Sequence, residues 1–269
     1  DVFFGVKHLM PFFDLAIKKG VGAFIALRVL PAFVRLVIGE DHHIEDTATE
    51  YFGTEVTQWG AQMRLGRFTR LGRGRERGLL PFIKAKLIKD VSSIAKRDQE
   101  GILELVDDII LPAIASVREG LVTSFQAIRS LAAEQCKQVG RDIKWRLTPE
   151  IIGSSELAEI HKTLVLPTTE EIHQLVLHLN QLLSRLKKID GKEEDFEKPF
   201  AIETGQLGAY RDRLVRLANN LTESTGSKVD PSAVPWIEID AERSHIVRLI
   251  RCPLHVGDAL AEWVYPNLK

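Results

Sequence analysis

Apolar residues recur at three- and four-residue steps across the middle of the sequence, over 102–121 and again over 169–188. This spacing puts apolar side chains on one face of a helix, so it predicts two long helices that pack into a core. Ile109 belongs to the first of these apolar faces. Pro112 lies inside the same pattern and predicts a kink or a break, because proline removes a helical hydrogen bond. A further helix is predicted over 203–222.

Shorter elements lie on both sides of this helical region. The run over 34–38 is largely apolar and ends at Gly39. Such a run is typical of a buried parallel strand with functional residues at its carboxyl end. Further elements are predicted near both ends of the chain, namely strands over 236–239 and 246–250 and helices over 8–19 and 256–264.

The predicted secondary structure therefore changes from mixed helix and strand to helix alone, and then back to mixed helix and strand. An insertion within an α/β domain produces this order of elements. We expect three zones, which are a partial α/β domain over 1–47, a helical insertion over 48–233 and a return into the α/β domain over 234–269.

Composition narrows the class of protein. With 45% hydrophobic and 27% charged residues, the chain has the profile of a soluble globular protein. Its 36 basic and 37 acidic residues nearly cancel, so net charge argues neither for nor against a nucleic-acid partner. Cys136 and Cys252 are too few for a four-thiolate zinc or iron–sulfur site and favour a reducing, cytoplasmic location. The apolar stretch over 21–38 carries Arg28 and Arg35, so no membrane anchor is predicted.

An acidic tip, Gly39-Glu40-Asp41-His42, directly follows the strand predicted over 34–38. Nucleotide triphosphatases use this arrangement, in which one carboxylate holds the magnesium shell and a second orients the attacking water. Two other interpretations remain open. The tip is also compatible with a solvated helix start, or with a metal-dependent phosphohydrolase site formed by His42, His43 and Asp46.

Around this tip the sequence resembles the DinG/XPD-type DEAH-box DNA helicases, whose motif is Asp-Glu-Ala-His. Residues 43–49 continue with a histidine, an apolar residue, Glu-Asp and an Ala-Thr pair, as DinG relatives do. The resemblance implies that Glu40 is the catalytic glutamate and that His42 couples ATP to the DNA-contacting motifs. Gly39 stands where the family has its metal-binding aspartate, and Asp41 stands where it has alanine. Asp41 is therefore the candidate metal ligand.

Two further segments resemble the same family. Residues 7–16 resemble the segment that precedes the acid motif, and residues 234–238 and 252–257 resemble the stretch that leads to the Ser-Ala-Thr motif. The resemblance implies a predominantly α-helical, arch-like insertion flanked by α/β pieces of a RecA-like motor domain. For the whole protein it implies ATP and magnesium as cofactors, single-stranded DNA and the remaining helicase domains as partners, and in one branch an iron–sulfur cluster.

The sequence contains no Gly-x-x-x-x-Gly-Lys-Ser/Thr phosphate loop, and it begins at Asp1 with residues that are already apolar. We therefore expect an internal segment of such a helicase that does not hydrolyse ATP by itself. The alternative is a non-catalytic helical module that binds DNA or a protein partner and carries a decayed acid motif. Gly39 favours this alternative.

A basic cluster is the candidate contact with single-stranded DNA. Six arginines alternate with glycines in one short stretch, where phosphate contacts are expected to give salt-dependent binding. They are Arg64, Arg67, Arg70, Arg73, Arg75 and Arg77. Phe68 is a candidate for stacking on a base. The alternative is a solvated, partly disordered loop. Trp59 and the other three tryptophans are predicted to be core or interface residues.

Overall fold

A computed structural model describes most of the helical region of the chain and parts of both ends. The described residues are 2–5, 36–39, 52–72, 74–89, 94–136, 142–191, 198–226, 231–240 and 246–258. The chain divides into two compact units. The first comprises 1–55, 229–236 and 250–269, and the second comprises 56–228 and 237–249.

The first unit contains a parallel pair of strands, β1 (Val2–Gly5) and β2 (Leu36–Gly39). Val2 lies opposite Leu36 and Gly5 lies opposite Gly39. The parallel strand predicted over 34–38 is thus confirmed for its described part. The helix predicted over 8–19 lies outside the described residues.

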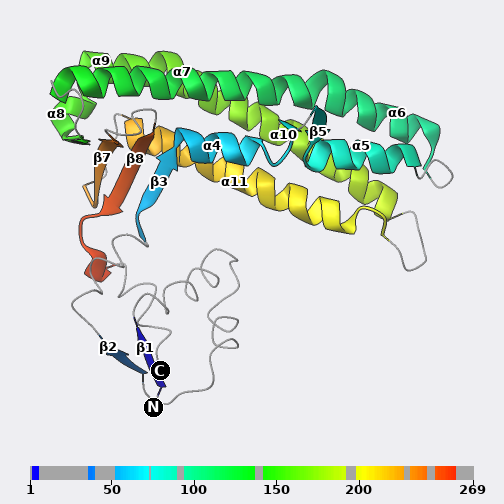
Figure 1. Cartoon of the computed structure of the whole chain (residues 1–269), viewed down its shortest axis with the longest axis horizontal. Coiled ribbons are helices and arrows are strands. Elements are labelled where there is room, and N and C mark those ends of the chain that lie inside the picture. The colour runs from blue at the N-terminus through cyan, green and yellow to red at the C-terminus, as the bar shows by residue number, and fades with distance from the viewer. Residues whose placement is uncertain are drawn as a thin grey trace. The chain divides into compact units, whose positions relative to one another are not determined.

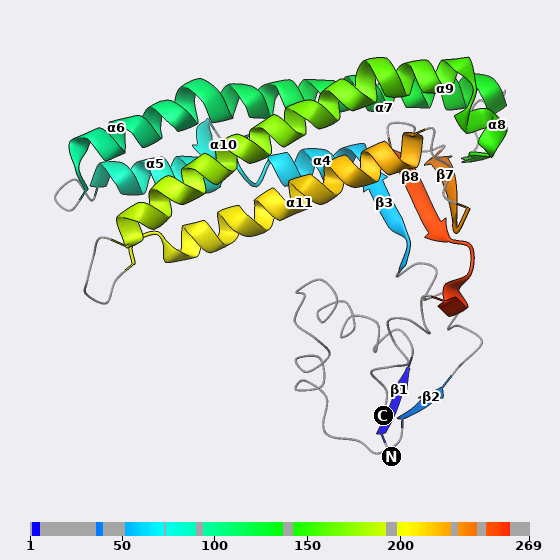
Figure 2. The ribbon, with the colours of Figure 1, turned by 180° about the vertical axis from the view of Figure 1, so that it is seen from behind.

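The second unit is mostly helical, and its long helices run side by side in Figures 1 and 2. The helices are α4 (Gln58–Leu65), α5 (Leu79–Lys89), α6 (Lys96–Glu104), α7 (Leu111–Cys136), α8 (Pro149–Ile152), α9 (Ser155–Ile160), α10 (Leu166–Asp190) and α11 (Ala201–Thr225). Helix α10 packs against both α7 and α11, and α11 also contacts α4 and α5. The helices predicted over 169–188 and 203–222 are confirmed.

A four-stranded sheet has the strand order β3-β8-β7-β6. Its strands are β3 (Thr54–Thr57), β6 (Ile143–Arg146), β7 (Ala233–Ile239) and β8 (Val247–Pro253). The strands predicted over 236–239 and 246–250 are confirmed in β7 and β8. Of the helix predicted over 256–264, the structure describes 256–258, which are helical.

Pro112 does not split the first long helix. The chain is helical from Lys96 to Cys136, with a π-helical segment, η2 (Leu105–Ile110), just before the proline. The N–H of Leu111 donates to the carbonyl of Val106, five residues earlier. Proline lacks an N–H, and its ring collides with the carbonyl four residues before it in a regular α-helix. The wider π turn accommodates the proline at this position.

The second long helix also has a π-helical turn before a proline. A π-helical segment, η3 (His161–Val165), joins α9 to α10, and the N–H of Leu166 donates to the carbonyl of His161. Pro167 follows at once. Both long helices therefore pass through a π turn immediately before a Leu-Pro pair.

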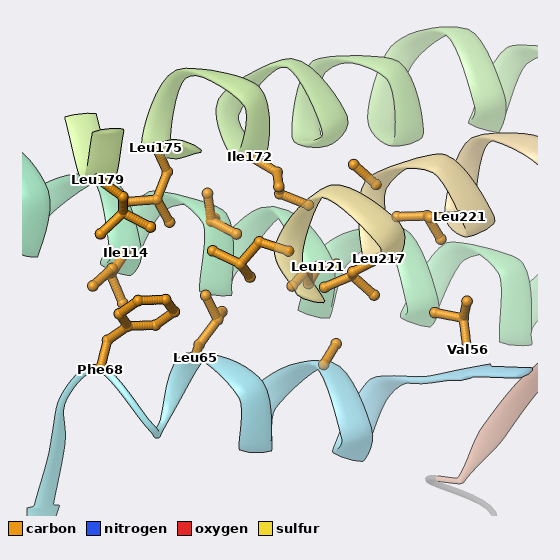
Figure 3. Close-up of a cluster of buried hydrophobic side chains, with 14 of the residues drawn as sticks. Val56, Leu65, Phe68, Ile114, Leu121, Ile172, Leu175, Leu179, Leu217 and Leu221 are labelled. Carbon is orange, nitrogen blue, oxygen red and sulfur yellow. The ribbon is translucent and has the colours of Figure 1, made fainter. Parts of the chain in front are cut away.

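The periodic apolar faces form the core of the second unit, as predicted. Ile114, Leu121, Ile172 and Leu175 are at most 1% exposed. Figure 3 shows Leu121 and Ile172 near Leu217 of α11, and Ile114 and Leu175 near Leu179. Ile109 is an exception to the prediction, since it is 42% exposed. It lies within η2, where the π turn adds one residue and rotates the following side chains away from the α-helical phase.

Helices α7 and α10 approach closely at Gly120. A Cβ atom on Gly120 would lie 2.6 Å from Thr168 Oγ1. That hydroxyl is buried, donates to the carbonyl of Leu164 at 2.8 Å, and lies 3.3 Å from Ser124 Oγ. Thr168 therefore has little freedom to move away, and the crossing requires a residue without a side chain.

A buried carboxylate links the last residue of α10 to the first turn of α11. Asp190 is 6% exposed and accepts a hydrogen bond of 2.8 Å from the N–H of Phe200. Phe200 is the N-cap residue of α11. A negative charge near this end of a helix is stabilised by the positive end of the helix dipole. The bond fixes where α11 begins.

His161 lies where η3 meets the end of α11. Its Nδ1 is 2.9 Å from Thr225 Oγ1. Burial lowers the pKa of His161 below its ordinary value of 6.5. The folded protein therefore favours the neutral imidazole.

Gly120→Ala is expected to destabilise the second unit by about 1–3 kcal/mol, because the new methyl group collides with Thr168. Gly205→Ala in α11 is the matched control, since a Cβ there meets nothing within 4 Å; it should raise stability by about 0.5–1 kcal/mol through helix propensity. Urea unfolding followed by circular dichroism measures both. Adding Thr168→Ala should recover part of the loss in Gly120→Ala. Equal stabilisation by both glycine substitutions would contradict the close crossing.

Protonation of His161 is expected to destabilise the fold. Since its folded pKa is lowered, the unfolded chain takes up the proton first, and the stability contributed by neutral His161 is lost as pH falls below about 6.5. The Tm of the wild type should therefore fall between about pH 7 and pH 5 more steeply than that of His161→Gln, which keeps a polar partner for Thr225. His173→Gln, at an exposed position of α10, is the control. Parallel Tm profiles for the wild type and His161→Gln would contradict this role.

Candidate nucleic-acid interface

The acid motif predicted to carry catalysis lies beyond the end of β2. Gly39 is the last residue of that strand. Glu40, Asp41 and His42 lie outside the described residues, as do His43 and Asp46. Their catalytic and metal-binding roles remain predictions.

The arginine segment, by contrast, is a short hairpin in its described part. Strands β4 (Arg70–Gly72) and β5 (Arg75–Arg77) pair antiparallel, with Arg70 opposite Arg77. Gly74, with a φ of 73°, lies in the turn and adopts a conformation that favours glycine. These residues therefore form a solvent-exposed hairpin. Arg73 lies outside the described residues.

Both ends of the hairpin are held by backbone hydrogen bonds. The N–H groups of Leu79 and Leu80 donate to the carbonyls of Arg67 and Phe68, each at 3.0 Å. Gly78 has a φ of 130°, and a Cβ there would lie 2.5 Å from the carbonyl oxygen of Phe68. Only glycine permits the two ends of the hairpin to come this close.

Phe68 is a core residue, and the prediction that it stacks on a base is wrong. Its side chain is fully buried and lies near Ile114 and Leu65 in Figure 3. Its ring meets Tyr210 of α11 edge to face, with ring centroids 5.7 Å apart. Phe68 thus anchors the base of the hairpin to α11.

Helix α11 adds two arginines to this region. The pKa of Arg64 is lowered, first by its partial burial and then by the positive charges of Arg216 and Arg213. The guanidinium groups of Arg213 and Arg216 therefore lie close enough to Arg64 to repel its positive charge. None of the ion pairs between described residues involves any of the three.

A chain of contacts joins these arginines to the hairpin. The guanidinium of Arg213 lies 5.7 Å from the centroid of the Tyr210 ring, and Tyr210 lines the same pocket as Arg67 and Arg70. We call the combined basic region the arginine surface. Its described members are Arg64, Arg67, Arg70, Arg75, Arg77, Arg213 and Arg216.

Sequence reasoning missed Arg213 and Arg216 because they lie about 150 residues beyond the cluster in the chain. Their three-residue spacing on a predicted helix was the available signal, since it puts both on one face. Nothing in the sequence indicated that this face adjoins Arg64.

A concave pocket of about 440 Å³ lies beside the hairpin. The residues that give it chemical character are Arg67, Arg70, Phe82, Glu203, Gln206 and Tyr210. Phe82 is 58% exposed and the neighbouring Ile202 is 73% exposed. The pocket thus combines cationic, aromatic and apolar groups with one carboxylate.

The carboxylate of Glu203 is held by Lys86 of α5. Lys86 Nζ is 3.0 Å from Glu203 Oε1, donates to the carbonyl of Pro199, and lies 5.3 Å from the centroid of the Phe200 ring. Glu203 is 4% exposed, and its Oε2 has no hydrogen-bond partner among the described residues. One carboxylate oxygen is therefore fixed and the other lacks a donor.

Comparison with models of known protein families gives no match, and comparison with curated proteins gives none either. What the arginine surface binds is therefore inferred from its own chemistry.

Two remaining predictions concern tryptophan and membranes. Trp59 on α4 is 68% exposed, so it is not a core residue of this unit, and its assignment to an interface stays a prediction. Trp145 and Trp236 are partly buried, and Trp263 lies outside the described residues. In the part of the chain that the structure describes, no helix has the length and apolar character needed to cross a membrane.

Proposed function

We propose that this chain is a segment of an ATP-dependent DNA helicase of the DinG/XPD type, and that its helical unit binds single-stranded DNA through the arginine surface. The observation that carries the DNA-binding proposal is the grouping of Arg64, Arg213 and Arg216 without a carboxylate partner among the described residues. The sequence resemblance around Glu40 and His42 supports the wider assignment.

Like charges gathered in this way cost free energy in the absence of an anion. The hairpin repeats the pattern, since Arg70 and Arg77 are directly opposite each other and like charges at such positions are destabilising. A phosphate backbone relieves both repulsions, and guanidinium groups bind phosphate oxygens in a bidentate fashion. Binding also releases the counterions of the nucleic acid.

The pocket favours a single strand over a duplex. Its apolar and aromatic groups, including Phe82 and Tyr210, lie beside the cations Arg67 and Arg70. Proteins that bind single strands combine a cationic track with groups that receive unstacked bases. In a duplex the faces of the bases are stacked inside and do not reach such groups.

A non-catalytic helical module that binds DNA or a protein partner is the second candidate. Gly39, in place of the family's metal-binding aspartate, favours it. Both candidates use the arginine surface, so DNA binding does not separate them. A phosphate loop in the gene upstream of Asp1 would favour the helicase.

The triple substitution Arg64→Gln, Arg213→Gln and Arg216→Gln is expected to weaken binding to a fluorescent dT20 oligonucleotide on the order of 30-fold at low salt. The slope of log Kd against log salt should decrease by about 2, since each lost phosphate contact on a single strand contributes about 0.7. Fluorescence anisotropy at several salt concentrations measures both. The Tm should not fall, because the substitutions remove mutual repulsion.

Lys144→Gln, Arg146→Gln and Lys162→Gln together form the charge-matched control, since these exposed cations lie on β6 and η3. This variant should keep most of the affinity. Equal weakening by the two triple variants would show that binding depends on net charge alone, and would overturn the proposed interface.

The isolated chain is expected to show no ATPase activity with magnesium, with or without single-stranded DNA, because its sequence contains no phosphate loop. A coupled phosphate-release assay measures this. Activity in the purified chain that disappears in Glu40→Gln would contradict the expectation.

A further inference from the structure

Trp59 is the most exposed aromatic side chain in the part of the chain that the structure describes. It is 68% exposed, compared with 58% for Phe82. Tryptophan side chains are highly buried on average, because their large apolar area is costly to leave in water. An indole in this position indicates a surface that a partner covers, provided that neighbouring groups extend the surface beyond a single side chain.

Trp59 begins a row of exposed side chains along α4. Met63, one turn later, is 39% exposed, and Arg67, a further turn on, is exposed as well. The N–H of Gly66 donates to the carbonyl of Gln62 at 2.9 Å, so helical geometry continues just past the end of α4. Residues four apart on a helix lie on one face, and the row extends over roughly 12 Å. We call these three residues the α4 row.

Helix α4 is fixed so that this row faces solvent. Ala61 and Leu65, on its opposite face, are at most 1% exposed. The amide Nε2 of Gln62 donates to the carbonyl of Arg118 on α7 at 3.2 Å, which holds the helix against its neighbour. The row is therefore a preformed surface, and a partner need not order the backbone beneath it.

The charges along the row favour an anionic partner. Arg67 belongs to the arginine surface and lines the pocket beside the hairpin together with Arg70. No residue of α4 is acidic, and the acidic residue nearest to Trp59 in the sequence, Glu55, lies on β3 before the helix begins. A partner that is anionic and also offers flat apolar groups is a single strand of nucleic acid with unstacked bases.

We infer that Trp59 stacks on a base of the bound single strand, and that the α4 row extends the arginine surface as a track on which Arg67 holds a phosphate. The inference rests on the proposed function, since the arginine surface supplies most of the phosphate contacts. Met63, between the two, offers a polarisable sulfur that packs favourably on aromatic rings. Every base has a π face, so this contact accepts all four bases.

A strand without bases separates stacking from charge. Oligonucleotide dT12 and an abasic strand of the same length carry the same phosphates, and the wild type should bind dT12 more tightly. Trp59→Leu should weaken dT12 binding on the order of tenfold and leave the affinity for the abasic strand unchanged, because leucine has no aromatic face. Fluorescence anisotropy at low salt measures both affinities.

Two further variants serve as references for Trp59→Leu. Trp59→Phe keeps a smaller aromatic face and should retain part of the affinity for dT12. Leu177→Ala removes an exposed apolar side chain from α10, where leucine is 52% exposed, and should bind both strands like the wild type. Circular dichroism establishes that each variant is folded.

The indole also reports directly on its own contact. Stacking on a base quenches tryptophan fluorescence, so saturating dT12 should reduce the emission of the wild type more than the saturating abasic strand does. This difference should disappear in Trp59→Leu, which keeps the other three tryptophans. A purely structural role of Trp59 would not make the quenching depend on bases. In the absence of DNA, acrylamide should quench the wild type more strongly than Trp59→Leu.

The outcomes separate the stacking contact from the proposed function. Equal affinity of the wild type and Trp59→Leu for dT12 would overturn stacking while DNA binding by the arginine surface stands. If neither strand binds at low salt, both proposals are overturned. Protection of Trp59 from acrylamide before DNA is added would show that another part of the chain or a second copy covers it, and would also overturn stacking. Should Trp59→Leu fail to fold, equal quenching of the wild type by the two strands would overturn it.

Discussion

Burial of aliphatic side chains between α7, α10 and α11 is the interaction on which the rest of the second unit depends. Fully burying each leucine or isoleucine contributes about 1.5–3 kcal/mol. The seam they form, with Leu121 on α7, Ile172 on α10 and Leu217 on α11, fixes the position of α11. That position brings Arg213 and Arg216 to Arg64 and brings Glu203 to Lys86. The charged groups could not gather in this way without the apolar seam beneath them.

The long helices could be predicted because their periodic apolar faces pack as the pattern requires. The errors arose where three-dimensional context overrides local pattern. Ile109 fits the periodicity but lies in a π turn, and Pro112 is tolerated because of that turn. Phe68 stands among arginines in the sequence, yet its ring is needed to anchor the hairpin against Tyr210. In these cases the neighbour that decides the outcome is distant in sequence or depends on an unusual backbone.

The candidate site was likewise predictable from the sequence only in part. Arginines crowded in one stretch could be found from the sequence, whereas their partners on α11 and the orphaned oxygen of Glu203 could not. Whether Glu203 is a solvated surface carboxylate or a buried one depends on how α5 packs on α11, and no local pattern encodes that. Electrostatics at this surface therefore follows from tertiary packing rather than from composition, which is nearly neutral.

The two π turns determine which neighbouring elements the two parts of each long helix pack against. An added residue rotates the later part of a helix by about 100° relative to the earlier part. The chain before η2 packs on α5 and α10, and the chain after it packs on α4, α9 and α10. Likewise α9 packs on α7 and α8, whereas α10 packs on α7 and α11. Deleting one residue from either π turn would therefore rotate the later part of the helix relative to the earlier part, so that both parts could not keep their present neighbours at once.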